Sequence, residues 1–119
     1  MMLKRVIVES PYAGDVEANL RYLRACLADC LKRGEAPFAS HALYTQPGVL
    51  DDGKPEERRL GMEAGFEWAR AADATVVYTD RGVSRGMTAG IQHAEEHGRP
   101  IERRELGGEW ASALRGDGV

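Results

Sequence analysis

The chain has 119 residues, which is enough for one domain with one core and too few for two domains of ordinary size. Hydrophobic residues make up 43% of it and charged residues 29%, a balance typical of globular proteins and not of disordered chains. The net charge of −3 excludes the basic field that attracts a nucleic-acid polymer, but not a single nucleotide as ligand.

Two strands and one helix are predicted in the first third of the chain. Residues 3–9 contain a run of β-branched residues that stops before a proline, which favours a central strand. Asp15 is placed to cap a helix over residues 16–33, where apolar residues recur every three or four positions, as on a helix that covers one sheet face. Residues 37–43 predict a weaker strand, and the proline at its start favours the edge of the sheet.

A long loop and a second helix follow. Residues 44–59 hold turn-forming and acidic residues typical of a functional loop, which we expect to border the ligand site. Pro55 suits the first position of a helix that runs to about residue 72. Gly61, Gly65 and Ala69 form a line of small residues along this helix, which would let it approach the sheet or a partner helix closely.

The stretch over residues 74–98 predicts the centre of the sheet. Residues 75–79 are β-branched or aromatic and uncharged, as in strands buried on both faces. Asp80 follows at the carboxyl end of this strand, and Ser84 is placed as the N-cap of a helix that Gly98 ends. A last, polar edge strand is expected over residues 100–105, and the tail beyond it holds Trp110 and little else that would order it.

The alternation of strands and helices predicts a single Rossmann-like α/β domain with helices on both faces of the sheet. We expect three layers, α/β/α, around a parallel sheet of four to five strands, with the domain over residues 1–106 and a tail over residues 107–119. Ligands of such sheets bind beyond the carboxyl ends of the strands. Asp80 and the amides around Ser84 to Met87 would therefore face a ligand.

The cysteines and histidines do not indicate a metal site. Cys26 and Cys30 lie four apart on a predicted helix, a spacing that rarely suits a disulfide, and we interpret them as core residues in a reducing compartment. His93 and His97 have the same spacing and could hold a metal, but solvated helix positions are the commoner case. We expect neither metal nor cofactor. No apolar run approaches the roughly 20 residues of a membrane span, which favours a cytoplasmic protein without a membrane partner.

Several fragments, in their order and spacing, resemble the nucleoside 2-deoxyribosyltransferase-like superfamily, and most closely its small bacterial and phage branch. The fragments are SPYAG, PFASHALYTQ, ERRLGMEAGFEW, ADATVVYTD and SRGMTAGIQHA. The resemblance implies a flavodoxin-like fold that cleaves or exchanges the N-glycosidic bond of nucleosides or their monophosphates. It also implies a nucleoside or nucleotide as ligand, and a homo-oligomer, a dimer or higher, that completes the pocket with a neighbour's residues.

The resemblance also indicates where the reactive carboxylate is expected. In the family the attacking glutamate lies on the helix after a central strand, in a pattern similar to GMxxEI, whereas this chain has GMTAGI with Gly90 at that place. Cleavage develops positive charge on the sugar, which a carboxylate beneath the anomeric carbon stabilises. Glu9 and Asp80 lie at the ends of the first and third strands, and we predict both as catalytic, with a preference for Asp80 because a similar family position carries an acidic residue near the sugar. The alternative is a catalytically silent module that binds or sequesters a nucleotide-derived molecule.

The predicted substrate-binding residues come from the loops and helix starts on this rim. Tyr12 would either stack on a base or cover the edge of the core, and helix N-terminal amides would hold a 5′-phosphate where one is present. Purely structural explanations stay open for these residues, as strand ends, turn residues, helix caps or a solvated first turn, and a structural assembly unit that uses the Gly61 and Gly65 face is a third interpretation. The set comprises Ser10, Pro11, Tyr12, Gly14, Asp52, Glu57, Ser84, Gly86, Met87 and Gly90.

Overall fold

The computed structural model describes residues 2–108 and contains one parallel sheet. Four strands follow one another in the order β2-β1-β3-β4. They are β1 (Lys4–Glu9), β2 (Glu35–Phe38), β3 (Ala74–Tyr78) and β4 (Ile101–Arg104). The predicted central places of β1 and β3 and the edge places of β2 and β4 are confirmed. Trp110 lies outside the described residues.

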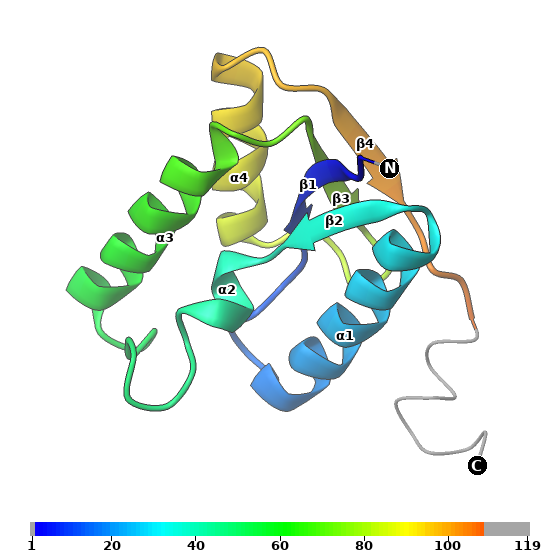
Figure 1. Ribbon diagram of the computed structural model, residues 1–119. Coiled ribbons are helices and arrows are strands. Elements are labelled where there is room, and N and C mark those ends of the chain that lie inside the picture. Colours follow the sequence, from blue (N-terminus) through cyan, green and yellow to red (C-terminus); the bar gives the residue numbers. More distant parts are fainter. Residues whose placement is uncertain (1, 109–119) are drawn as a thin grey trace.

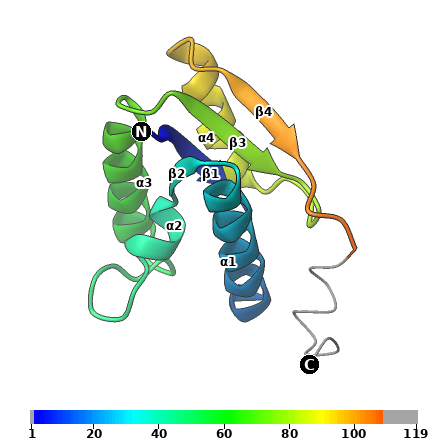
Figure 2. The ribbon, with the colours of Figure 1, turned by 45° about the vertical axis from the view of Figure 1, so that its right-hand side comes forward.

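Helices cover both faces of the sheet. They are α1 (Val16–Lys32), the short α2 (Ser40–Leu43), α3 (Pro55–Ala69) and α4 (Arg85–Glu96). Helix α1 lies against one face, and α3 and α4 lie on the other side, as Figures 1 and 2 show. The three layers and this strand order make the protein a flavodoxin-like, Rossmann-like α/β domain, as the alternating pattern predicts.

The helix ends are formed by the predicted residues. The Asp15 side chain accepts a hydrogen bond from the amide of Ala18 at 3.2 Å, and Ser84 Oγ accepts one from the amide of Met87 at 3.3 Å. Gly98 follows α4 with a φ of +65°, a conformation that favours glycine and stops the helix. Local sequence signals therefore determine where α1 and α4 begin and where α4 ends.

The two faces of the sheet bury different sets of side chains. Val6, Val8 and Val76 pack with Cys26 and Cys30 in the core beneath α1. Both cysteines are buried and free, as predicted for core residues. Because neighbouring side chains alternate along a strand, Glu9, which follows Val8, points to the opposite face, where α4 lies. This alternation brings a carboxyl group to the α4 side of the sheet.

The strand predicted over residues 37–43 is wrong in its second half. Strand β2 ends at Phe38, and residues 40–43 form the one-turn helix α2. Four residues are too few to show a helical period, and α2 is held by packing on α3, where a Cβ on Gly65 would lie only 2.6 Å from Ser40 Oγ. Of the predicted line of small residues on α3, Gly65 therefore provides the close contact with α2. None of the described helices is long and apolar enough to cross a membrane.

Candidate functional site

A pocket of about 670 Å³ opens at the carboxyl ends of β1 and β2. Its walls come from the loop after β1, from α2, from the loop before α3 and from the first turns of α3 and α4. This is the edge at which parallel α/β sheets bind ligands. The volume lies within the range of pockets that bind small molecules.

The structure brings most of the predicted site residues to this one pocket. Pro11 and Gly14 are not among its lining residues, and Gly90 lies behind it, against Glu9. Ser84 lines the pocket and also caps α4, so the structural role considered for it is present together with its place in the pocket wall. The predicted residues that line the pocket are Glu9, Ser10, Tyr12, Asp52, Glu57, Ser84, Gly86 and Met87.

Glu9 is the acid at the back of the pocket. Its carboxyl group forms no hydrogen bond or ion pair with the part of the chain that the structure describes, and it lies directly against Gly90 of α4. Burial raises the pKa of this carboxyl from 4.5 to about 8, although the charge of Arg99 opposes the shift. At neutral pH Glu9 is therefore mainly protonated and can donate a proton.

Arg99 supplies a buried positive charge on the same side of the sheet. Its guanidinium donates hydrogen bonds to Thr75 Oγ1 at 2.9 Å and to the carbonyl of Ala69 at 3.1 Å. It also lies 2.9 Å from His93 Nδ1, and because arginine only donates, this nitrogen accepts the hydrogen bond. Glu9 is the group whose charge favours the protonated form of Arg99, so the two charges are coupled without direct contact.

The Ser10 and His41 side chains form a pair in the pocket wall. Ser10 Oγ lies 2.8 Å from His41 Nε2, and Ser10 is only 4% exposed. Burial lowers the pKa of His41 from 6.5 to about 4, so the imidazole is neutral at physiological pH. The pair offers a neutral hydrogen-bonding surface beside the acid.

Charged residues form the rim between α3 and α4. Arg58 Nη1 binds Asp52 Oδ2 at 3.1 Å, and Arg58 Nη2 would lie 3.6 Å from a Cβ placed on Gly86, in the first turn of α4. Glu57 Oε1 accepts a hydrogen bond from the amide of Asp51 at 3.1 Å. The Met87 amide is capped by Ser84 Oγ, but the earlier first-turn amides of α4 have no intrahelical partner, so these amides and the Arg58 guanidinium together form a surface that suits an anion.

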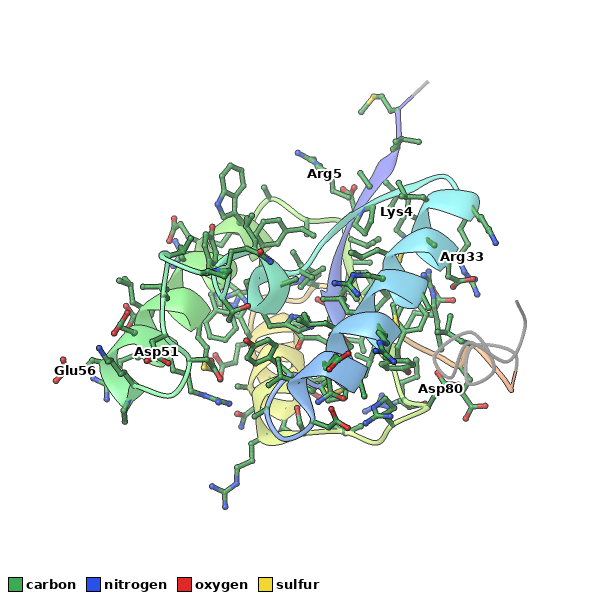
Figure 3. All side chains as sticks on the ribbon, turned by 90° about the horizontal axis from the view of Figure 1, so that it is seen from below. Lys4, Arg5, Arg33, Asp51, Glu56 and Asp80 are labelled. Carbon is green, nitrogen blue, oxygen red and sulfur yellow. The ribbon has the colours of Figure 1, made fainter. Side chains whose placement is uncertain are left out.

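The structure does not bring Asp80 to the pocket. Its carboxylate accepts hydrogen bonds from the Tyr22 hydroxyl at 2.6 Å and from the amides of Leu106 and Gly107 at 2.9 to 3.0 Å. Burial would raise the pKa of Asp80, but these donors outweigh it and hold the pKa below its usual value. In Figure 3 Asp80 lies on the side of the molecule away from Asp51, whose loop borders the pocket. Asp80 therefore anchors the segment after β4 to α1.

Several lining residues were missed by sequence reasoning. His41, Tyr44 and Thr45 line the pocket because β2 ends at Phe38, which places them beyond its carboxyl end. The predicted strand over residues 37–43 places these residues inside or next to a strand and so conceals that they line a pocket. With the strand ending at Phe38, a histidine shortly after its carboxyl end would have indicated a site residue. Met62 and Phe66 reach the pocket from α3, and their apolar character alone gives no such signal.

A family model described as a domain of unknown function (DUF7768) matches residues 4–104. The chain belongs to the DUF7768 family. Comparison with curated proteins gave no match. The matched range includes all four strands and every pocket-lining residue of this DUF7768 domain. The family description states no activity, so a function has to be argued from the pocket itself.

Proposed function

We propose that the pocket binds a nucleoside or nucleotide and that the protonated Glu9 carboxyl promotes cleavage of its N-glycosidic bond. The observation that carries this proposal is a carboxyl group that is protonated at neutral pH at the back of a pocket of nucleotide size. Apolar burial is a known way to keep such an acid protonated and ready to donate. The sequence resemblance to nucleoside 2-deoxyribosyltransferase-like proteins supports the same substrate class.

Cleavage of the N-glycosidic bond needs a proton donor for the leaving base and a group that adds to C1′ of the sugar. The bond between C1′ and the base nitrogen breaks, its electron pair goes to the base, and Glu9 gives the base its proton. Water adds to C1′ and releases a proton to solvent, or a second base takes the place of water. The Glu9 carboxylate left behind is stabilised by the nearby charge of Arg99.

The remaining lining residues fit the other parts of such a ligand. Tyr12 and Tyr44 offer aromatic surface for a base, and the neutral Ser10 and His41 pair offers hydrogen bonds to hydroxyl groups. The first-turn amides of α4 and Arg58 suit a 5′-phosphate. Each part of a nucleotide thus has a region of matching chemistry in one cavity.

Release of free base measures the proposed activity. Purified protein would be incubated with nucleosides, 2′-deoxynucleosides and their 5′-monophosphates, and free base would be separated by chromatography. We expect Glu9→Gln to reduce the rate by roughly 100-fold or more, the usual contribution of a general acid. The wild-type rate should also fall as the pH rises through about 8, because Glu9 then loses its proton.

A matched control comes from Glu56, an exposed glutamate of the first turn of α3 that does not line the pocket. Glu56→Gln should leave the rate unchanged. Base release that survives in Glu9→Gln would contradict the assigned role of Glu9. An absence of both binding and release over the whole panel would contradict the substrate class.

A silent binding module is the second candidate. Two other acids line the pocket, Asp52 and Glu57, and both are engaged, Asp52 with Arg58 and Glu57 with the Asp51 amide. No second carboxylate is therefore poised beside Glu9 among the described lining residues. Binding by the wild type without base release would support this candidate over the enzyme.

A further inference from the structure

Gly90 lies in α4 at the point where the helix meets the Glu9 side chain. A Cβ built on Gly90 would lie 2.1 Å from Oε2, 2.4 Å from Cδ and 2.7 Å from Oε1 of Glu9. Real Cβ atoms essentially never approach other atoms closer than 3.0 Å. The carboxyl group of Glu9 therefore fills the volume that a side chain at position 90 would need.

Other glycines of the same region do not show this relation. A Cβ on Gly86, one turn earlier in α4, would meet nothing closer than 3.6 Å, and one on Gly61 nothing closer than 3.3 Å. Gly65 is also crowded, with Ser40 Oγ 2.6 Å from its Cβ position, but this neighbour is not ionisable and belongs to a contact between two helices. A Cβ on Gly53 would come no closer than 3.2 Å to Asp51 Oδ1, so among the described glycines Gly90 is the one where a Cβ would come closer than 3.0 Å to an ionisable group.

The backbone of α4 does not itself call for glycine at position 90. Gly90 is not among the glycines with positive φ, and it lies in the middle of a helix, where glycine is a poor helix former. The clearance for Glu9 is what distinguishes this position from its neighbours in the helix.

We propose that Gly90 is a positioning residue: it provides the volume that holds the Glu9 carboxyl at the back of the pocket, so that β1 and not α4 supplies the acid. Positions 9 and 90 then share one volume, and only one of them can fill it. The steric part of this inference is independent of substrate, whereas its consequence for the reaction rests on the proposed function.

A double-mutant cycle tests the shared volume without any ligand. Gly90→Ala should lower the melting temperature by roughly 5 °C in the wild-type background, because the new methyl group displaces the Glu9 carboxyl. In the Glu9→Ala background the same change should be neutral or stabilising, because the space is vacant and alanine is the better helix former. Equal changes in the two backgrounds would overturn the proposal.

Carboxyl titration by ¹³C NMR gives a readout that a purely structural role would not move. In Gly90→Ala the displaced Glu9 carboxyl should reach pocket water, and its pKa should fall from about 8 toward its ordinary 4.5. Gly86→Ala is the matched control on the same helix and should leave the Glu9 pKa in place. An unchanged Glu9 pKa in Gly90→Ala would count against positioning by Gly90.

The acid can then be moved from the strand to the helix. Aspartate is the suitable replacement, because its carboxyl carbon lies one C–C bond, about 1.5 Å, from Cβ and so within the vacated volume. Glu9→Ala/Gly90→Asp should recover base release by about tenfold over Glu9→Ala alone. A folded double variant with no recovery would show that the shared volume does not define the acid's working position.

The two proposals fail in different ways. If the wild type releases no base but the coupling between positions 9 and 90 is found, the proposed function fails and the positioning stands. If the wild type releases base in a Glu9-dependent way and no coupling is found, the positioning fails and the proposed function stands.

Discussion

Glu9 and Asp80 lie at the carboxyl ends of two neighbouring parallel strands, β1 and β3, yet their carboxyl groups have opposite surroundings. Asp80 is turned to the α1 side, where Tyr22 and the amides of Leu106 and Gly107 hold it ionised with a lowered pKa. Glu9 is turned to the α4 side, where burial without a hydrogen-bonding partner in the described chain raises its pKa to about 8. The same functional group thus anchors one face, and on the other it is kept protonated and able to donate.

The difference shows which property marks a reactive group. A carboxylate that accepts several hydrogen bonds is stable and committed to the fold, whereas a buried carboxyl that lacks them keeps its proton and its capacity to react. Position at the end of a strand is common to both acids and therefore does not distinguish them. The number of hydrogen bonds that the carboxyl oxygens accept distinguishes them.

Asp80→Asn should have the largest effect on folding. An amide nitrogen cannot accept the amide hydrogen bonds that the carboxylate oxygen accepts, and the loss of charge-assisted bonds should lower the free energy of unfolding by about 3 kcal/mol. Urea denaturation measures this directly. The matched change Glu9→Gln should cost far less at pH 7, because Glu9 is already protonated.

The rate of base release should rank the same two variants in the opposite order from their stability. Asp80→Asn should retain base release for as long as it is folded, whereas Glu9→Gln should lose it. An Asp80 variant of normal stability without base release would place Asp80 in the reaction and reverse the comparison.

The fold could be predicted because its signals are local. Runs of β-branched residues, helical spacing and the caps at Asp15 and Ser84 each lie within a few residues of one another, and the elements they predict are present. Helix α2 could not be predicted in this way, since its four residues are stabilised by contact with Gly65, far along the chain.

The site could be predicted only in part, because the sequence does not show which way a buried strand faces. All five residues of β3 are buried, so no alternation of polar and apolar residues indicates that Asp80 belongs to the α1 face. The family resemblance likewise leads us to expect an acid at position 90, where the chain has Gly90. The structure shows that the space beside Gly90 is taken by the carboxyl of Glu9, a contact between residues 81 positions apart.

The pH dependence of stability should sharpen the comparison. Between pH 4.5 and about 8 the folded state keeps the Glu9 proton that the unfolded state loses, so stability should fall as the pH rises through this window. Allowing for contact with pocket water, the loss attributable to Glu9 is about 2 kcal/mol. Thermal unfolding of wild type and Glu9→Gln at pH 5 and pH 8.5 isolates it, because the variant should lack this part of the decline. Parallel curves for the two proteins would show that Glu9 titrates normally.

Tyr22→Phe should give the smallest effect and test the other half of the comparison. The hydroxyl of Tyr22 donates to Asp80 Oδ1 and accepts from the Asp80 amide at 2.9 Å, so its removal should cost about 1 kcal/mol of unfolding free energy. Asp80 has a lowered pKa, so its contribution is present at neutral pH and is lost as the pH falls through that folded-state value. Without the Tyr22 donor the pKa of Asp80 should rise, and acid unfolding should begin at higher pH. Tyr44→Phe, which removes the hydroxyl of a pocket-lining tyrosine, should leave the pH at which acid unfolding begins unchanged. If acid unfolding of Tyr22→Phe begins at the same pH as in the wild type, the Leu106 and Gly107 amides alone hold Asp80 ionised. The contact of Asp80 with α1 would then add nothing to its stabilisation.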